Sequence, residues 1–71
     1  RINKMENYCF ENGEYYGDAF YHGFPGIWEI TMYHFPNNST NFKIVGTYPS
    51  FNKPSQKSFN EIVEKIKQKN L

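Results

Sequence analysis

The clearest strand signal in the chain is the run Ile27-Trp28-Glu29-Ile30-Thr31-Met32-Tyr33-His34-Phe35. Apolar and polar side chains alternate along it from Trp28 to Tyr33. A period of two is typical of a strand with one buried face. We therefore predict a strand over about residues 27–35, and the remaining elements are placed relative to it.

Two strands are predicted before it, over about residues 7–11 and 14–21. The pair Asn12-Gly13 lies between them and suits a two-residue type I′ hairpin turn, whose central positions both need φ > 0. The segment from His22 to Gly26 contains two glycines and a proline, so we expect a loop there.

A fourth strand is predicted over about residues 41–48, after a polar turn. Phe42 and Ile44 fall on one face of it, and we expect them to contact a helix together with Trp28, Ile30 and Met32. The segment from Pro49 to Ser55 contains two prolines and is predicted to be a loop.

The last predicted element is an amphipathic helix over about residues 58–69. Its apolar residues are spaced at i, i+3, i+4 and i+7, which puts them on one stripe: Phe59, Ile62, Val63 and Ile66. Ser58 with Glu61 has the spacing of a capping box, and Glu61 is expected to pair with Lys65. Because short connections favour antiparallel pairing, the sequence predicts one α+β domain over residues 1–71. It is a small antiparallel β-meander of three to four strands, packed by the C-terminal helix.

The composition indicates a binding role. Seven Phe, six Tyr and one Trp make up 20% of the 71 residues. A domain of this size buries only about 60% of its unfolded surface, so part of this aromatic area should line an exposed face. Exposed aromatic patches usually mark interaction sites. We expect a sheet face to bind another protein through six residues: Tyr16, Phe20, Tyr33 and Phe35, with Glu14 and Asp18 at the rim.

No set of residues in the sequence indicates catalysis, a metal or a cofactor. Cys9 is the only cysteine, so an internal disulfide is excluded. With His22 or His34 it could form a thiol–imidazole pair, but no protease signature surrounds it. The spacing of these three residues matches no zinc motif. We therefore expect a non-enzymatic interaction module, such as an inhibitor, an immunity-type partner or a minor subunit of an assembly.

The charge distribution leaves nucleic-acid binding as the alternative. The net charge is only +1, yet residues 1–35 contain two basic and five acidic side chains, and residues 36–71 contain six lysines and two glutamates. Lys43, Lys53 and Lys57 could follow a phosphate backbone while sheet aromatics stack on bases. The segment from Gly26 to Tyr48 and the following helix resemble the arm-binding domains of phage-type integrases in pattern and topology, which implies a nucleic-acid partner.

The sequence also contains several weaker signals. The segment from Tyr15 to Gly26 resembles a membrane-occupation-and-recognition-nexus repeat, which begins Tyr-x-Gly. No apolar run approaches the roughly 18 residues that a membrane helix needs, and a single cysteine suits a reducing, intracellular (cytoplasmic) setting. The many Asn, Lys, Ile and aromatic residues are typical of an AT-rich phage, viral or parasite genome.

Overall fold

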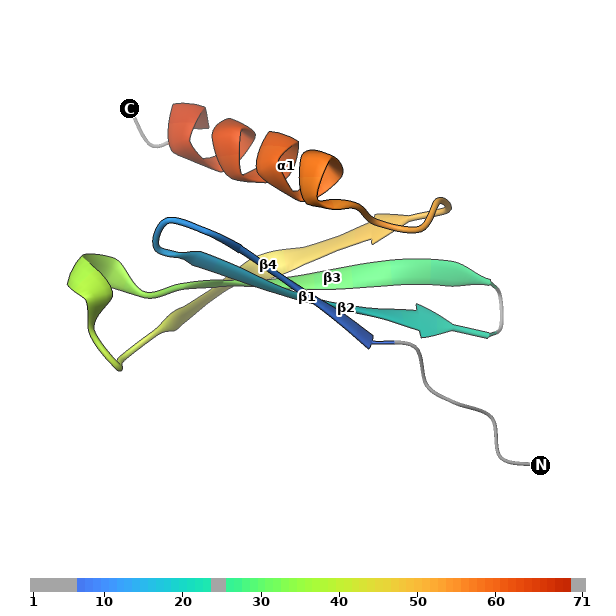
Figure 1. Cartoon of the computed structure of the whole chain (residues 1–71), viewed down its shortest axis with the longest axis horizontal. Helices are drawn as coiled ribbons and strands as arrows, with labels where there is room; N and C mark the ends of the chain where they lie inside the picture. Colours follow the sequence, from blue (N-terminus) through green and yellow to red (C-terminus); the bar gives the residue numbers. More distant parts are fainter. Residues whose placement is uncertain (1–6, 24–25, 70–71) are drawn as a thin grey trace.

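The computed structural model, which describes residues 7–23 and 26–69, is an α+β fold of one four-stranded sheet and one helix. The antiparallel strands are β1 (Asn7–Asn12), β2 (Tyr15–His22), β3 (Ile27–His34) and β4 (Lys43–Ser50), in that spatial order. The helix α1 (Gln56–Lys69) lies over one face of the sheet (Figure 1). A short 3-10 turn, η1 (Pro36–Asn38), connects β3 to β4. The predicted meander with its C-terminal helix is thus confirmed. Phe24 and Pro25 of the predicted loop lie outside the described residues.

The hairpin between β1 and β2 turns one residue later than the sequence predicted. Asn12 pairs with Tyr15, so the two central residues are Gly13 and Glu14. Gly13 has φ of 61°, whereas the φ of Glu14 is not positive. Positive φ at the first central position alone is the pattern of a type II′ turn, which takes Gly there. The predicted type I′ turn centred on Asn12-Gly13 is therefore wrong.

The core lies between α1 and the face of the sheet that it covers, which we call the helix-facing side. Its buried apolar side chains come from β2, β3 and α1: Tyr15, Ala19, Ile30, Met32, Phe59, Val63 and Ile66. Phe59 is fully buried and its ring lies over Gly17. A Cβ atom at Gly17 would lie 2.3 Å from Cε1 of that ring, so only glycine admits the helix at this distance.

A bulge in β4 reverses the predicted orientation of its first residues. Gly46 pairs with Met32, but Ile44 pairs with Tyr33, so Val45 is an extra residue in the ladder. An extra residue shifts the side chains that precede it to the opposite face. Ile44 therefore shares a face with Tyr33, and the prediction that Phe42 and Ile44 contact the helix is wrong.

The structure also extends β4 past the predicted boundary. Pro49 and Ser50 belong to the strand and pair with Glu29 and Trp28, although they were predicted to be loop. Proline has no amide hydrogen to donate to a neighbouring strand. Pro49 is tolerated because β4 is an edge strand, with β3 on one side only.

The helix begins at Gln56, two residues before the predicted start, because a different serine caps it. The amide of Ser58 donates to Ser55 Oγ at 3.1 Å, and the amide of Ser55 donates to Ser58 Oγ at 2.8 Å. This reciprocal arrangement is a capping box with serine at both positions. Ser58 is thus the third residue of the helix, and the predicted box with Glu61 is wrong.

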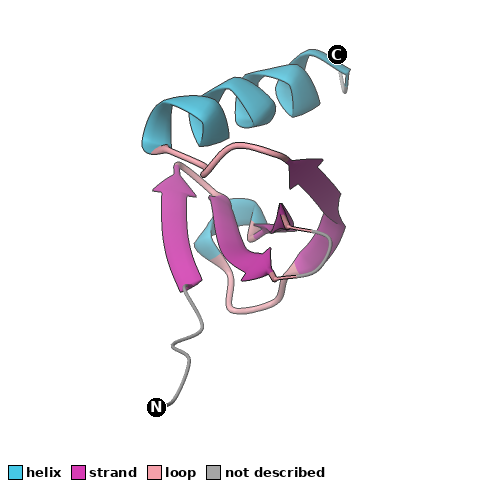
Figure 2. Ribbon diagram, turned by 90° about the vertical axis from the view of Figure 1, so that its right-hand side faces the viewer, coloured by secondary structure: helices cyan, strands magenta, loops and turns pink. Residues whose placement is uncertain are grey.

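Polar contacts hold α1 against the β1 side of the sheet. Asn12 Nδ2 donates to Asn60 Oδ1 at 2.9 Å, and Gln56 Nε2 donates to the carbonyl oxygen of Glu11 at 3.0 Å. Seen from the end of the sheet, α1 lies on one side of the strands (Figure 2). The face of the sheet turned away from α1, which we call the outer face, is covered by none of the described residues.

Candidate functional site

The outer face carries a continuous group of aromatic and aliphatic side chains, the outer aromatic patch. It consists of Tyr16, Tyr33, Phe35, Phe42 and Ile44. The ring centroids of Tyr16 and Tyr33 are 6.1 Å apart, and Phe42 lies 5.3 Å from both Tyr33 and Phe35. The Tyr33–Phe42 pair is edge-to-face at 87°, a geometry that aromatic rings favour. Ile44 joins them as the register partner of Tyr33.

The patch is slightly hollowed. Its four aromatic residues and Asp18 line a shallow depression of about 220 Å³. A second depression, of about 330 Å³, shares Tyr16 and Phe35 and extends to the β1–β2 turn. A concave aromatic surface of this kind can receive side chains of a partner.

The exposure of the patch is unusual for side chains of this type. Phe42 is 52% exposed and Ile44 is 63% exposed, and the neighbouring Val45 is 38% exposed. Single exposed apolar residues are normal on protein surfaces. Here three exposed apolar residues are close neighbours in sequence: Phe42, Ile44 and Val45. Two of them, Phe42 and Ile44, adjoin half-buried aromatic rings. Full burial of one such side chain contributes about 1.5–3 kcal/mol. A partner that covered these side chains would therefore be bound with a substantial apolar contribution to the binding free energy.

The charge of the outer face is uniformly acidic. Among the described residues of this face, Glu11, Asp18 and Glu29 are carboxylates, and no lysine or arginine is present. Glu29 contacts His22 at 3.0 Å. Glu11 and Asp18 flank Tyr16 in the sheet, and neither forms an ion pair with another of the described residues. The field above the patch is therefore negative.

Tyr16 is the member of the patch with the most perturbed chemistry. A hydrogen bond with the Cys9 thiol, partial burial, and the nearby Asp18 and Glu11 raise the pKa of Tyr16 to about 12. Each of these effects disfavours the charged phenolate. The hydroxyl of Tyr16 is therefore a neutral hydrogen-bonding group throughout the physiological range.

Removing the thiol should shift this titration. In Cys9→Ala we expect the pKa of Tyr16 to fall toward its ordinary value of 10, because the largest of its causes is lost. The raised pKa also costs stability as pH rises from 10 through 12, and this loss should shrink in the variant. An NMR titration of the tyrosine ring carbons measures the pKa of Tyr16 in the wild type and in Cys9→Ala. An unchanged Tyr16 titration in Cys9→Ala would show that burial and the nearby carboxylates, rather than the thiol, set the pKa.

Phe20, which the sequence grouped with the patch, lies elsewhere on the outer face. It pairs with Glu29 toward the opposite end of the strands, and its ring contacts His22 at 5.0 Å. Asp18 and Thr31 separate it from Tyr16 and Tyr33 along β2 and β3. The structure thus brings Tyr16, Tyr33, Phe35 and Asp18 together and leaves Phe20 outside that group.

Glu14, predicted as a rim residue, is engaged in the fold. Its carboxylate contacts His34 Nε2 at 2.9 Å and accepts a hydrogen bond from the Asn37 amide at 3.0 Å. These two bonds hold the pKa of Glu14 below its ordinary value. Asn37 has φ of 56°, so the carboxylate stabilises a turn that includes a left-handed residue.

The role of Glu14 predicts a pH-dependent loss of stability. Because its pKa is lowered in the folded protein, Glu14 stabilises the fold above its ordinary pKa of 4.5. This contribution is lost as pH falls through the lowered folded value. Glu14→Gln should therefore be less stable than the wild type at pH 7, and the difference should shrink as pH falls below 4.5. Urea unfolding at a series of pH values measures it, and a difference independent of pH would refute this role.

The three lysines of the nucleic-acid alternative lie away from the outer aromatic patch. Lys43 pairs with His34, whose ring stacks on the core residue Tyr15 at 4.5 Å, so Lys43 belongs to the helix-facing side. Lys53 lies 4.6 Å above the ring of Tyr8, beside the core. Lys57 is exposed on α1. The predicted combination of these lysines with the outer aromatics is not assembled on one surface.

Cys9 and the two histidines are also separated. Cys9 is exposed on the outer face and pairs with Asp18, which is four residues before His22 along β2. His34 lies on the helix-facing side in contact with Glu14. Within residues 7–23 and 26–69, no group of three or more His, Cys, Asp or Glu side chains is arranged to hold a metal ion. In the same residues, no helix is long and apolar enough to cross a membrane.

Sequence reasoning missed Phe42 and Ile44 as members of the site. Strict alternation through β4 assigns them to the core, and only a bulge moves them to the outer face. Gly46 was the available signal, because a glycine inside a strand often marks a bulge.

Comparison with known proteins gives no further assignment, since no family model, curated protein or solved structure matches the chain.

Proposed function

We propose that this chain is a non-enzymatic protein-interaction module that binds a protein partner through the outer aromatic patch. The observation that carries the proposal is the exposure of Phe42 and Ile44 beside Tyr16, Tyr33 and Phe35, on a face with no lysine or arginine among the described residues. A role as an inhibitor, an immunity-type partner or a minor subunit of an assembly is compatible with this surface.

The composition of the patch supports binding to a protein. Aromatic residues are enriched at interface centres, where they supply contact area with few rotatable bonds. A standard interface needs about 800 Å² on each partner, which is the scale of a sheet face rather than of a single pocket. The two depressions provide places for anchoring side chains.

The negative charge of the outer face indicates which charge a complementary partner would have. Glu11 and Asp18 adjoin the patch without an opposing cation, so a partner with apolar anchors and a basic rim is complementary. Such complementarity raises the association rate and fixes orientation more than it raises affinity. A phosphate backbone would meet carboxylates here, which disfavours nucleic acid on this face. The free thiol of Cys9 suits a partner in a reducing compartment.

The test is capture with the tagged domain from a native lysate, with and without nuclease. We expect one protein in stoichiometric amount, unaffected by nuclease and lost when the bait carries Phe42→Ser. The captured protein should be basic at its contact surface, and its association rate should fall with salt. Recovery that collapses with nuclease would refute the proposal and favour a nucleic-acid partner. Recovery that survives Phe42→Ser would place the binding surface elsewhere.

A further inference from the structure

A groove opens on the helix-facing side, between the C-terminal half of α1 and β4. It encloses about 490 Å³, and six residues line it: Tyr48, Ile62, Lys65, Ile66, Gln68 and Lys69. It exists because the contacts that hold α1 join it to β1, at Asn12 and Glu11. The β4 edge of the same face is left partly uncovered. This volume is within the range of small-molecule sites, about 300–1,000 Å³.

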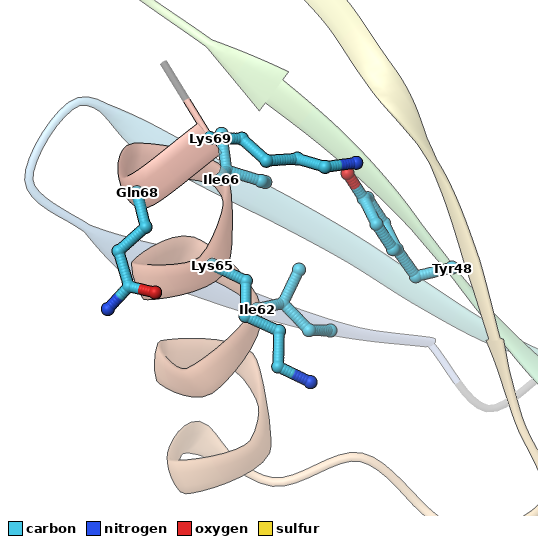
Figure 3. Close-up of a pocket in the computed structure, with 6 residues that line it drawn as sticks. All are labelled: Tyr48, Ile62, Lys65, Ile66, Gln68 and Lys69. Carbon is cyan, nitrogen blue, oxygen red and sulfur yellow. The ribbon is translucent and has the colours of Figure 1, made fainter. Parts of the chain in front are cut away.

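The groove has an apolar wall and a cationic rim. Ile62 and Ile66 project from α1 toward the ring of Tyr48 on β4 (Figure 3). Figure 3 also shows the amino group of Lys69 and the hydroxyl of Tyr48 pointing toward one another across the opening. Lys65 lies one helical turn before Lys69 and lines the same groove. Among the residues that the structure describes, no carboxylate lines it.

The two lysines that line the groove form no ion pair within the described residues. The predicted pair between Glu61 and Lys65 is not formed, and the ion pair of α1 joins Lys67 to Glu64 at 4.0 Å. Neither Lys65 nor Lys69 contacts a carboxylate among the described residues. The C-terminal end of a helix is the negative end of its dipole, so an anion here must be held by these side chains rather than by backbone amides.

We infer that this groove binds a small amphipathic carboxylate, with its aliphatic chain against Ile62, Ile66 and Tyr48 and its head group at Lys65 and Lys69. Charge complementarity selects the anionic head, and the apolar wall selects the chain. A protein partner is disfavoured because none of the large exposed apolar residues lines the groove. A protein interface would also have to cover the charged outer side of α1.

The experiment is an NMR titration of the isotope-labelled domain with decanoate, kept below its self-association concentration. We expect saturable shifts of the Ile62, Lys65 and Ile66 amides and of the Tyr48 ring. Lys69→Gln should weaken binding about fivefold, as expected for one solvent-accessible ion pair. Lys67→Gln is the matched control on the same helix, and it should bind as the wild type does. Decanol and acetate, which each lack one half of the chemistry, should bind much more weakly.

Four results would overturn the inference. They are the absence of saturable shifts, equal effects of Lys67→Gln and Lys69→Gln, equal binding of decanol and decanoate, and equal binding of acetate and decanoate. The inference does not depend on the proposed function. Phe42→Ser, which should abolish protein capture, should leave decanoate binding unchanged, so failure of one can be distinguished from failure of the other.

Discussion

Replacing Phe59 with Ala should unfold the domain under conditions in which the wild type is folded. Phe59 is fully buried, and its ring stacks on Phe10 at a centroid distance of 5.5 Å and covers Gly17. Removing a buried phenyl ring costs about 3–5 kcal/mol. Domains are stabilised by only about 0.05–0.15 kcal/mol per residue, or about 4–11 kcal/mol for a 71-residue chain, so this loss removes a large fraction of the stability. Circular dichroism during thermal and urea unfolding measures it.

The matched control is Phe51→Ala. Phe51 is 84% exposed, so its truncation should change stability by no more than about 0.5 kcal/mol. An equal loss in the two variants would mean that Phe59 is not the centre of the core.

The same contact makes a second substitution informative. Gly17→Ala inserts a Cβ atom into the ring of Phe59 and should cost about 1–3 kcal/mol, as overpacking does. Combined with Phe59→Leu, its cost should be smaller, because the shorter side chain leaves room for the new methyl group. Two residues in direct contact are expected to be coupled by about 0.5–3 kcal/mol. Strict additivity of the two substitutions would contradict the close approach of α1 to β2.

The order of elements could be predicted from the sequence because periodicity is a local property. A strand is indicated by the alternation from Trp28 to Tyr33, and a helix is indicated by the spacing from Phe59 to Ile66. Their boundaries and faces depend on single residues that the pattern does not reveal. A bulge at Val45 reverses the first residues of β4. Ser55 rather than Ser58 caps the helix.

The candidate site was predictable only in part, for the same reason. Tyr16 and Tyr33 lie on the outer face because they alternate with core residues along β2 and β3. The role of Glu14 depends on His34 and Asn37, which reach it only after the chain has turned twice. No local pattern encodes such a contact. The groove beside α1 likewise follows from where the helix packs, which the apolar stripe of α1 does not specify.

Replacing Phe42 and Ile44 together with Ser should abolish partner capture and leave the fold intact. Both side chains are more than half exposed, so truncating them removes little packing. As anchors at the centre of an interface, each is expected to contribute at least about 2 kcal/mol. Together these losses weaken binding by roughly a thousandfold, since each 1.4 kcal/mol is a factor of ten. The affinity for the captured partner tests the predicted loss of binding. Urea unfolding of the wild type and of the double variant tests whether the fold stays intact.

Replacing Tyr33 and Phe35, two of the binding residues predicted from the sequence, with Ala should also abolish capture. These rings are half-buried, so this variant is expected to lose stability as well, and its result alone does not separate binding from folding. Phe51→Ser provides the matched control, because it removes an apolar side chain that is 84% exposed from a loop outside the patch. If Phe51→Ser weakened capture as much as the Phe42 and Ile44 double variant, general surface hydrophobicity would explain binding. Full capture by a well-folded double variant would exclude the outer aromatic patch, because Phe42 and Ile44 are its most exposed members.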